Sequence, residues 1–587
     1  MTEAAPLPTG WPVMTKDQAH ALLTAPGAKF EMEEKVIGGR TVRVWKNAPP
    51  TFRELFLASQ TYPDREFLVY ENDRATYPAF GKATIALAHD LIARGVNKGD
   101  RVALVMRNLP EWPVVYCASL IVGAIITPLN AWWTGPELHY GLTDSGAKVA
   151  IVDSERLERI AEHLDQCPDL QCVLVARHDE EVAHPKVSRL EAVIGAVNDW
   201  GKLPQLAMPE VPLAPEDAAT IFYTSGTTGK PKGAMASHRA GCSNIGATGI
   251  ANTRSLLMAG DPLPNPDPHL EPQKVNLLVV PLFHVTGCFA VLGPILATGA
   301  KLVLIRKWEP DQAMQLIERE KVNATGGVPT IAWQLIEHPS RAKYDLSSLD
   351  TVSYGGAPSA PELVRKIKET FKGSRPGNGW GMTETCATFT SHVGWEYIAK
   401  PDSCGPAAPV GDMKIMTVDG AGPLPAGEVG ELWVYGPNVV DGYWNKPEAT
   451  AQTFVDGWLK TGDLARLDED GYCYMIDRAK DMLIRGGENI YCIEVENVLY
   501  DHPAVMDAAL VGIPHRTLGE EPAAVVTLKP DATATERELR AFVAERLAAF
   551  KVPVKVLFRT ETLPRNANGK IMKNELKKLF ETERADA

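Results

Sequence analysis

The stretch that decides the fold spans residues 223–233 and reads YTSGTTGKPKG. Seven of its eleven residues are Ser, Thr or Gly, two are Lys, and the apolar run 218–222 before it predicts a buried strand. Small, hydroxylated residues after a strand form a concave nest of N–H groups and hydroxyls, which suits a polyphosphate. The stretch therefore predicts a phosphate-binding loop, and the two lysines favour this over a plain surface turn.

The glycine spacing separates this loop from the Walker A motif. That motif has four residues between its glycines and a Ser or Thr after its Lys. Here two residues separate Gly226 from Gly229, and Pro231 follows Lys230 in the place of the magnesium-holding hydroxyl. The loop is therefore not a Walker A loop.

Size and composition limit the class of protein. A chain of 587 residues suits two to four folding units, and its 45% hydrophobic and 23% charged content is ordinary for a globular protein. The net charge of −13 argues against nucleic-acid binding, because there is no basic excess to neutralise a phosphate backbone. An anionic substrate must therefore be held by local basic groups.

The cysteines and the apolar runs indicate a cytoplasmic protein. Nine cysteines occur without a CxxC pair, and the odd number favours a reducing compartment. The N-terminus lacks a basic-then-apolar signal pattern, and the longest apolar run, residues 114–129, is shorter than a membrane span. We expect that run to form a buried helix leading into a strand. Peripheral membrane contact and a homodimer remain open.

Short apolar runs alternate with helical patterns through the first two-thirds of the chain, which predicts βαβ units and mostly parallel sheets. The predicted strands are 101–106, 148–152, 172–176, 220–224, 275–280, 301–305 and 351–354. Residues 30–45, turning at Gly38 and Gly39, predict an N-terminal hairpin. Short strands with Gly/Pro turns at 410–435 predict a small β-barrel subdomain.

A compact unit is expected after Arg478, with roughly 105 residues. Its clearest helix starts at Thr535, which forms a capping box with Glu538 ahead of an apolar face. The predicted fold class is therefore α/β. A large N-terminal domain of mostly parallel sheets flanked by helices carries the barrel subdomain, and a small α+β domain follows it.

Several further motifs follow the loop in a consistent order. The chain contains, in sequence, YGGAP at 354–358, NGWGMTET at 378–385, TGD at 461–463, DRAKD at 477–481, RGGEN at 485–489 and LPRNANGK at 563–570. Glycines allow close approach of a flat ligand, and the Asp463 carboxylate could accept hydrogen bonds from both hydroxyls of a ribose.

This ordered set resembles the adenylate-forming superfamily, which includes acyl-CoA synthetases, non-ribosomal peptide adenylation domains and beetle luciferases. The resemblance covers roughly residues 51–579. It implies that ATP and a carboxylic acid form an acyl-adenylate and pyrophosphate, and that the thiol of CoA then displaces AMP. It also implies an adenylation domain at 1–477, a hinge at 478–481 and a mobile C-terminal domain at 482–587.

The resemblance assigns the catalytic groups. Lys570 would bridge carboxylate and phosphate oxygens, and Thr383 would hydrogen-bond the α-phosphate. Glu384 would hold Mg²⁺, without which a carboxylate would repel the phosphates. His284, after Phe283, would gate the carboxylate pocket, although a lone histidine is more often structural.

The resemblance also assigns the nucleotide and CoA contacts. The β- and γ-phosphates would be held by Thr224, Ser225, Gly226, Thr227, Thr228 and Lys232. Adenine would lie near Gly355, Gly356, Ala357, Asn378, Gly379 and Trp380. The family more often has Tyr at the position of Trp380, so only a hydroxyl contact is in doubt. Asp463 and Arg478 would bind the ribose, Lys480 would be the hinge residue, and Gly487 would leave room for pantetheine.

The predicted activity is therefore that of an AMP-forming acid–CoA ligase using ATP, Mg²⁺ and CoA. Residues 326, 327, 328 and 330 are expected to wall the acyl pocket, and the adjacent glycines favour a medium- or long-chain fatty acid. The alternatives are an aryl-acid CoA ligase, a carrier-loading adenylation domain, for which no room is expected after Lys570, and a non-catalytic nucleotide-binding protein. The joint presence of Lys570, Glu384 and Asp463 argues against the last.

Overall fold

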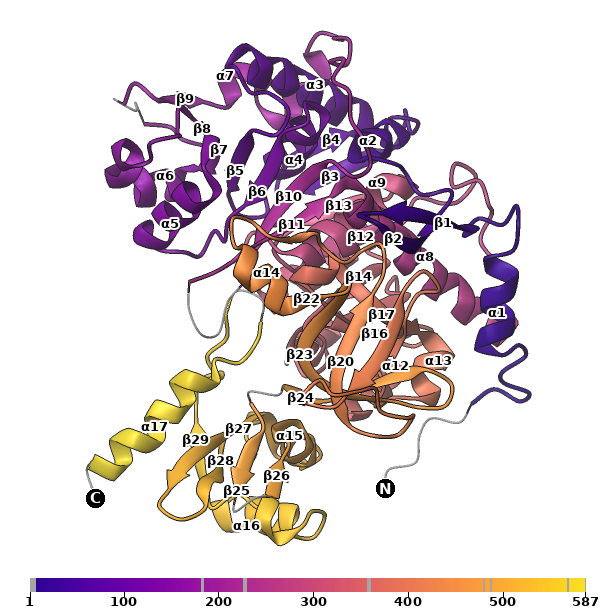
Figure 1. Ribbon diagram of the computed structural model, residues 1–587, viewed down its shortest axis with the longest axis vertical. Helices are drawn as coiled ribbons and strands as arrows, with labels where there is room; N and C mark the ends of the chain where they lie inside the picture. Colours follow the sequence, from indigo (N-terminus) through magenta and orange to yellow (C-terminus); the bar gives the residue numbers. More distant parts are fainter. Residues whose placement is uncertain are drawn as a thin grey trace.

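A computed structural model describes residues 7–180, 184–224, 230–355, 361–478, 481–485, 488–566 and 569–585. A large N-terminal part contains two eight-stranded sheets, and a small C-terminal unit hangs below it, drawn in yellow in Figure 1. Among the described residues, no helix combines the length and apolarity needed to cross a bilayer. All nine cysteines are free thiols.

The first eight-stranded sheet positions the phosphate loop. In spatial order its strands are β21 (Gly442–Tyr443), β11 (Gly233–Ser237), β10 (Ala218–Tyr223), β6 (Ile125–Pro128), β5 (Arg101–Val105), β7 (Ala147–Asp153), β8 (Cys172–Ala176) and β9 (Val187–Arg189). The strands from β10 to β9 are parallel, whereas β11 pairs antiparallel with β10. The loop therefore joins two neighbouring antiparallel strands.

The second eight-stranded sheet positions the adenine and acyl motifs. Its strands are, in spatial order, β17 (Ala387–Val393), β16 (Arg375–Met382), β15 (Thr351–Gly355), β14 (Ala324–Gly327), β12 (Val275–Leu278), β13 (Lys301–Leu304), β3 (Glu66–Tyr70) and β4 (Asp73–Thr76). The six central strands are parallel, and only the edges β17 and β4 are antiparallel. The predicted parallel α/β architecture is confirmed.

The largest hydrophobic core lies between these two sheets, because it takes side chains from β5 and β6 on one side and from β12 and β13 on the other. The helices that fill this space are α2 (Phe52–Ser59), α3 (Tyr77–Ala93), α4 (Glu111–Ile121), α7 (Glu191–Ile194), α8 (His238–Ala259), α9 (Gly293–Thr298) and the π-helical turn Thr286–Leu292. The expected buried helix ahead of a strand at 114–129 is thus α4 and β6.

The outer faces of the sheets carry their own helices. The first sheet packs against α5 (Gly135–Ser145) and α6 (Ser154–Ile160). The second packs against α10 (Pro310–Glu320), α11 (Pro329–Ile336), α12 (Pro361–Thr370) and α13 (Gly394–Ala399). Alternate residues of β12 therefore face two different cores.

An antiparallel subdomain and a hairpin complete the N-terminal part. The subdomain strands are β18 (Gly405–Pro406), β24 (Tyr472–Arg478), β23 (Trp458–Leu467), β20 (Gly430–Tyr435) and β19 (Asp412–Met416), with β22 (Phe454–Val455) beside β23. The order is an open path, and Ala407 beyond β18 bridges to Thr390 of β17, so the subdomain continues toward the second sheet. The hairpin is β1 (Met32–Ile37) and β2 (Arg40–Trp45), as predicted, between α1 (Lys16–Leu23) and the rest of the chain.

The C-terminal unit has a five-stranded sheet of its own. Its strands are β26 (Glu488–Ile490), β25 (Leu483–Arg485), β28 (Gly519–Leu528), β27 (Val505–His515) and β29 (Lys555–Arg559), and its helices are α15 (Cys492–Tyr500), α16 (Glu536–Ala544) and α17 (Lys573–Ala585). The predicted capping box between Thr535 and Glu538 starts α16. Two separate hydrophobic cores cover the faces of this sheet.

Candidate active site

A cavity of about 1640 Å³ lies where the two large sheets, the subdomain and the C-terminal unit meet. Its lining includes predicted site residues from distant positions in the sequence: Thr224, Lys232, His284, Gly355, Asn378, Gly379, Trp380, Thr383, Glu384, Asp463, Arg478 and Lys570. Of the other predicted residues, Ser225, Gly226, Thr227, Thr228, Gly356, Ala357, Lys480 and Gly487 lie outside the described residues. The described candidates are thus brought together.

The described ends of the phosphate loop are fixed by the hairpin beneath it. The Thr224 backbone N–H donates to the Lys232 carbonyl at 2.8 Å, which extends the β10–β11 pairing by one step. The Lys232 ammonium lies 4.9 Å from the centroid of the Tyr443 ring. A cation is attracted to the face of an aromatic ring, and Lys232 is among the residues that line the cavity.

Glu384 is a buried carboxylate, 6% exposed, in the single 3₁₀ turn Thr383–Thr385 that follows β16. The Tyr443 hydroxyl donates to its Oε1 at 2.6 Å. Burial raises the pKa of Glu384, whereas the Tyr443 hydrogen bond and the charge of Lys570 lower it. A buried carboxylate whose hydrogen bonds come from the neutral Tyr443 hydroxyl and from its own backbone N–H fits a divalent cation, for which hard oxygen ligands are preferred.

Asp463 is hydrogen-bonded to the indole of Trp380, which is 9% exposed and belongs to the hydrophobic core of the antiparallel subdomain. The Trp380 indole Nε1–H donates to Asp463 Oδ2 at 2.9 Å, and Arg478 Nε lies 3.3 Å from Oδ1. The indole is therefore oriented by the carboxylate expected to bind ribose. Gly355 and Gly379 sit on adjacent strands, and a Cβ at Gly355 would approach the Gly379 carbonyl oxygen to 2.7 Å. The missing side chains thus keep two strand backbones close together beside the ring.

Lys570 reaches the cavity on a turn of the C-terminal unit. Its backbone N–H donates to Asn566 Oδ1 at 3.0 Å, and Gly569 before it has a φ of +74°, which glycine adopts readily. A Cβ at Gly569 would lie 2.7 Å from Val328 Cγ2 of the N-terminal part. The turn is therefore seated against the N-terminal part, with Lys570 among the residues that line its cavity.

His284 lines the cavity from the segment between β12 and the π-helical turn Thr286–Leu292. The Thr286 backbone N–H donates to His284 Nδ1 at 3.3 Å, so Nδ1 is an acceptor and the ring proton of the neutral form is on Nε2. Burial, followed by the nearby charge of Lys570, lowers the pKa of His284 to about 3. The ring is therefore neutral across the physiological range.

The cavity continues as a tunnel along the second sheet. From Gly355 and Gly379 at the carboxyl ends of the strands, the lining extends to Lys274, Ala324 and Thr351 at their amino ends. Gly355 is four residue steps along β15 from Thr351, which corresponds to a depth of about 13 Å. The opposite wall comes from α8 and from the segment leading into α9.

The structure corrects the inference drawn from the adjacent glycines in β14. A Cβ at Gly326 would lie 2.0 Å from the Ser353 carbonyl oxygen, and one at Gly327 would lie 3.2 Å from Ile331 Cγ1. These glycines therefore accommodate neighbouring protein atoms and do not leave space for an acyl chain. The length of the tunnel comes instead from the small and polar side chains along the strands.

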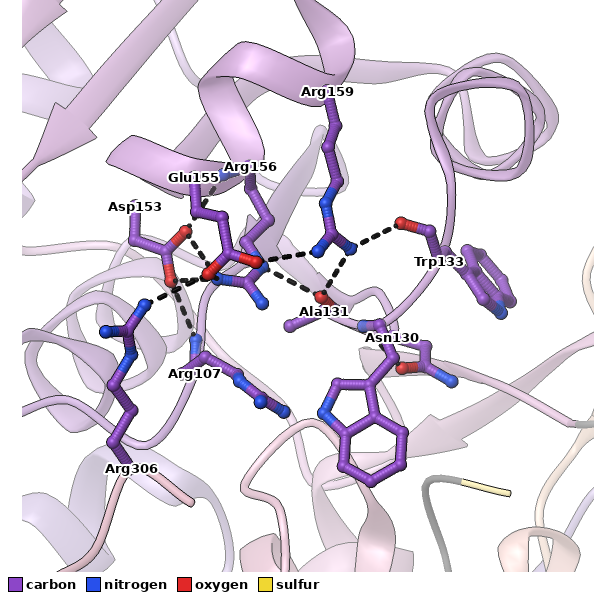
Figure 2. A network of polar contacts seen from close by, with 10 residues as sticks. Arg107, Asn130, Ala131, Trp133, Asp153, Glu155, Arg156, Arg159 and Arg306 are labelled. Carbon is purple, nitrogen blue, oxygen red and sulfur yellow. Dashed lines mark hydrogen bonds and ion pairs between the residues drawn. The ribbon is translucent and has the colours of Figure 1, made fainter. Parts of the chain in front are cut away.

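A network of charges borders the cavity beside Arg107 and connects the two large sheets (Figure 2). Glu155 pairs with Arg156 and Arg159 of α6 at 2.7 Å each, and with Arg306 after β13 at 3.0 Å. Asp153 Oδ2 accepts the Arg107 backbone N–H at 3.1 Å. The Arg107 guanidinium itself has no carboxylate partner among the described residues.

Comparison with known proteins defines the family. The AMP-binding enzyme family matches residues 55–444, and the AMP-binding enzyme C-terminal domain matches residues 494–570. A feruloyl-CoA synthase of Amycolatopsis sp is 35% identical over 506 residues, covering 86% of this chain and 94% of that protein. A long-chain-fatty-acid–CoA ligase of Bacillus subtilis (strain 168) is 34% identical over 534 residues, covering 88% and 92%.

A solved structure extends this relation to the fold. The anthranilate CoA ligase AuaEII in complex with anthranoyl-AMP has a TM-score of 0.78 at 26% identity, over 92% of this chain and 99% of that chain. The chain therefore belongs to the AMP-binding enzyme family, in the adenylate-forming superfamily. Within it, the chain is an AMP-forming acid–CoA ligase that uses ATP and CoA.

Two features of the site were missed from the sequence. Tyr443, the hydrogen-bond partner of Glu384, lies on the two-residue strand β21. In sequence this strand falls between the subdomain strands β20 and β22, but it pairs with the first large sheet. The hydrogen bond from Trp380 to Asp463 joins positions 83 residues apart. An aromatic residue two positions after Asp441 carries no local signal, so only the three-dimensional pairing identifies these contacts.

Proposed function

We propose that the acid activated by this ligase is an elongated one, a medium- or long-chain fatty acid, and that the residues described above act as follows. The observation that supports an elongated acid is the tunnel of about 13 Å that leads away from the adenylate region along β15. A small acid would leave most of that tunnel unfilled.

In the first half-reaction one carboxylate oxygen attacks the α-phosphorus of ATP, and the bond to the bridging oxygen breaks to release pyrophosphate. Both reactants are anions, so positive charge and donors must be fixed in advance around the phosphate. Lys570 bridges the carboxylate and α-phosphate oxygens, and Thr383 donates to the α-phosphate. His284, neutral at its lowered pKa, closes the acid side without adding charge.

Glu384 would hold Mg²⁺ against the phosphate oxygens, where the ion would neutralise charge on the leaving pyrophosphate. The loop from Thr224 to Lys232 contacts the same phosphates. Asp463 and Arg478 bind the ribose, and Trp380 offers its ring to adenine between Asn378, Gly379 and Gly355. The Asp463 carboxylate keeps the Trp380 ring in place by accepting the hydrogen bond from the indole Nε1–H.

In the second half-reaction the CoA sulfur attacks the acyl carbon and AMP leaves. The boundary of the units is proposed at 478–481, with the adenylation domain at 1–477 and the mobile domain at 482–587. Rotation there would withdraw Lys570 and bring Gly487 toward pantetheine.

At the cavity mouth, Arg107 lies 5.1 Å from the ring centroid of Trp132, which is 46% exposed. A guanidinium can bind phosphate and an indole can stack on a base, so the pair suits a phosphorylated nucleotide. We propose that the nucleotide part of CoA binds here.

An aryl acid is the second candidate. The feruloyl-CoA synthase and the anthranilate CoA ligase among the similar proteins are named for aryl acids. A planar acid would occupy the upper part of the tunnel and leave its deep end empty.

The test is an acid panel with ATP, Mg²⁺ and CoA, following AMP and pyrophosphate release. Saturated acids of increasing length, hydroxycinnamates and benzoates are compared by kcat/KM. Activity that rises with chain length supports the fatty-acid assignment, and a maximum at ferulate or coumarate replaces it with the aryl one. Silence across the whole panel would refute the proposal.

A further inference from the structure

Asn276 is the one partly exposed residue of β12, an interior strand between β13 and β14. The other three residues of this strand are buried. Partial exposure inside a sheet covered on both faces requires a void, and Asn276 is among the residues that line the tunnel. A polar amide therefore faces the space proposed for the acyl chain.

The strand register places Asn276 at the deep end. Asn276 pairs with Ala324, which pairs with Thr351, and all three line the tunnel. Its neighbour on β13 is Leu302, which belongs with Leu278 to the core on the tunnel side, whereas Val275 and Leu277 belong to the core under α10. Strand alternation thus directs Asn276 toward the tunnel.

The amide of Asn276 has no hydrogen-bond partner among the residues that the structure describes. Two other polar side chains of the wall are satisfied within their own helices: the Thr248 hydroxyl donates to the Asn244 carbonyl, and the Thr298 hydroxyl donates to the Pro294 carbonyl. An apolar chain would displace water from Asn276 and leave its donor and acceptor groups unpaired, which is unfavourable. A hydroxyl or oxo group at this depth would pair with them.

We infer that the substrate acid carries a hydrogen-bonding oxygen, a hydroxyl or oxo group, far from its carboxylate, and that Asn276 recognises it. This inference rests on the proposed function, since it assigns the acid of the same site. A depth of about 13 Å corresponds to roughly ten bonds of an extended chain, because three bonds span about 3.8 Å. The distal oxygen is therefore expected near the end of a chain of roughly ten carbons.

The experiment compares matched pairs of saturated acids that differ only in a terminal hydroxyl, with chains of eight, ten and twelve carbons. We expect the wild-type protein to favour the hydroxy acid of at least one pair by about tenfold or more in kcat/KM, as an otherwise unpaired polar site would. Asn276→Leu, which is close in size but apolar, should reverse that preference while retaining activity on the plain acid.

Thr248→Val is the matched control, because it removes a tunnel-lining hydroxyl whose hydrogen bond is already made within α8. It should leave the ratio of the two acids unchanged. Asn276→Thr is a second variant in case the leucine disturbs folding, and the wild-type comparison needs no variant at all.

The outcomes separate the two proposals. If no acid of any kind releases AMP, the proposed function fails. If plain acids are activated but the wild type shows no preference for a terminal hydroxyl, the role of Asn276 is overturned while the proposed function stands. An unchanged preference in Asn276→Leu would overturn it as well.

Discussion

The two ends of the cavity differ in how their polar groups are satisfied. At the end proposed to bind the nucleotide, called the nucleotide end below, Glu384 already accepts a hydrogen bond from Tyr443, and Asp463 accepts one from Trp380. At the acyl end, Asn276 has no such partner among the described residues. The wall there is formed by residues of paired strands, such as Asn276 and Ala324, and by helices from elsewhere in the chain.

This difference indicates which polar groups the protein orients before any substrate binds. ATP and the adenylate are common to every acid, so their contacts can be oriented by the protein itself before substrate arrives. The acyl end is completed only by the acid, because the Asn276 amide has no hydrogen-bond partner among the described residues. Variants should therefore affect one end and spare the other, and the predictions below test that separation.

The largest effect is expected for Lys570→Ala. Because Lys570 is proposed to act only while the carboxylate attacks the α-phosphorus, its loss should lower ATP–pyrophosphate exchange by about 10²–10³-fold. Thioester formation from a supplied acyl-adenylate should change by only a few-fold. Lys577→Ala is the control, because Lys577 lies on α17 just after the turn that carries Lys570, is partly exposed and is 3.7 Å from Glu520; this variant should leave both half-reactions intact. Equal loss of both would show that the proposed role of Lys570 is wrong.

Asp463→Asn should affect the nucleotide end alone. The amide keeps the shape but loses the charge that faces Arg478, so a buried charge-assisted contact is weakened. We expect the KM for ATP to rise about ten- to a hundredfold, with the KM for the acid nearly unchanged. Steady-state kinetics with each substrate varied in turn measures both. An equal rise for the acid would break the separation between the two ends.

Ala324→Leu should affect the acyl end alone. Ala324 lies in the deep layer beside Asn276, so a leucine there would shorten the tunnel. Activity with acids of twelve or more carbons should fall by about tenfold, in keeping with 1–3 kcal/mol for the misfit of a few methylenes, whereas hexanoate should be unaffected. Ala324→Ser, which adds little volume, is the matched control. Equal losses for short and long acids would indicate a general packing defect.

The same division explains what could be predicted from the sequence. The seven strands predicted in the first two-thirds match the structure within a few residues because their apolar runs are continuous, as for Cys172–Ala176. Other strands of the same region, such as β3, β11 and β14, were not predicted. The residues assigned to the nucleotide lie in compact motifs with recognisable spacing. Such motifs identify the residues proposed to bind ATP, which is the same ligand whichever acid is activated. The roles assigned to the described motif residues remain predictions, although the cavity brings those residues together.

The acyl end could not be predicted in this way. Asn276 lies inside an ordinary strand, and whether its side chain faces the tunnel or the core under α10 depends on which helices cover each face. The inference that the β14 glycines leave space for an acyl chain was wrong for a related reason. The space that a Gly326 side chain would take is occupied by the backbone of Ser353 on another strand. Both properties depend on contacts between segments distant in sequence.

The smallest effect is expected for Tyr443→Phe, which tests how far the nucleotide end depends on its internal partners. The Tyr443 hydroxyl stabilises the charged form of Glu384, so its loss should raise the pKa of this buried carboxyl further. The proposed Mg²⁺ contact needs the ionised form, and the acidic limb of the kcat/KM profile should therefore move to higher pH.

At pH 8 the same variant should lose only about fivefold, the equivalent of one hydrogen bond of about 1 kcal/mol, and added Mg²⁺ should recover part of that loss. Tyr140→Phe is the control, since its hydroxyl donates to the Pro231 carbonyl at 2.9 Å and has no contact with Glu384. Profiles of the wild type and the control should coincide in their acidic limbs. A Tyr443→Phe profile that falls uniformly at all pH values would mean that the tyrosine supports packing of β21 and not the charge of Glu384, and the nucleotide end would then be less prearranged than its contacts indicate.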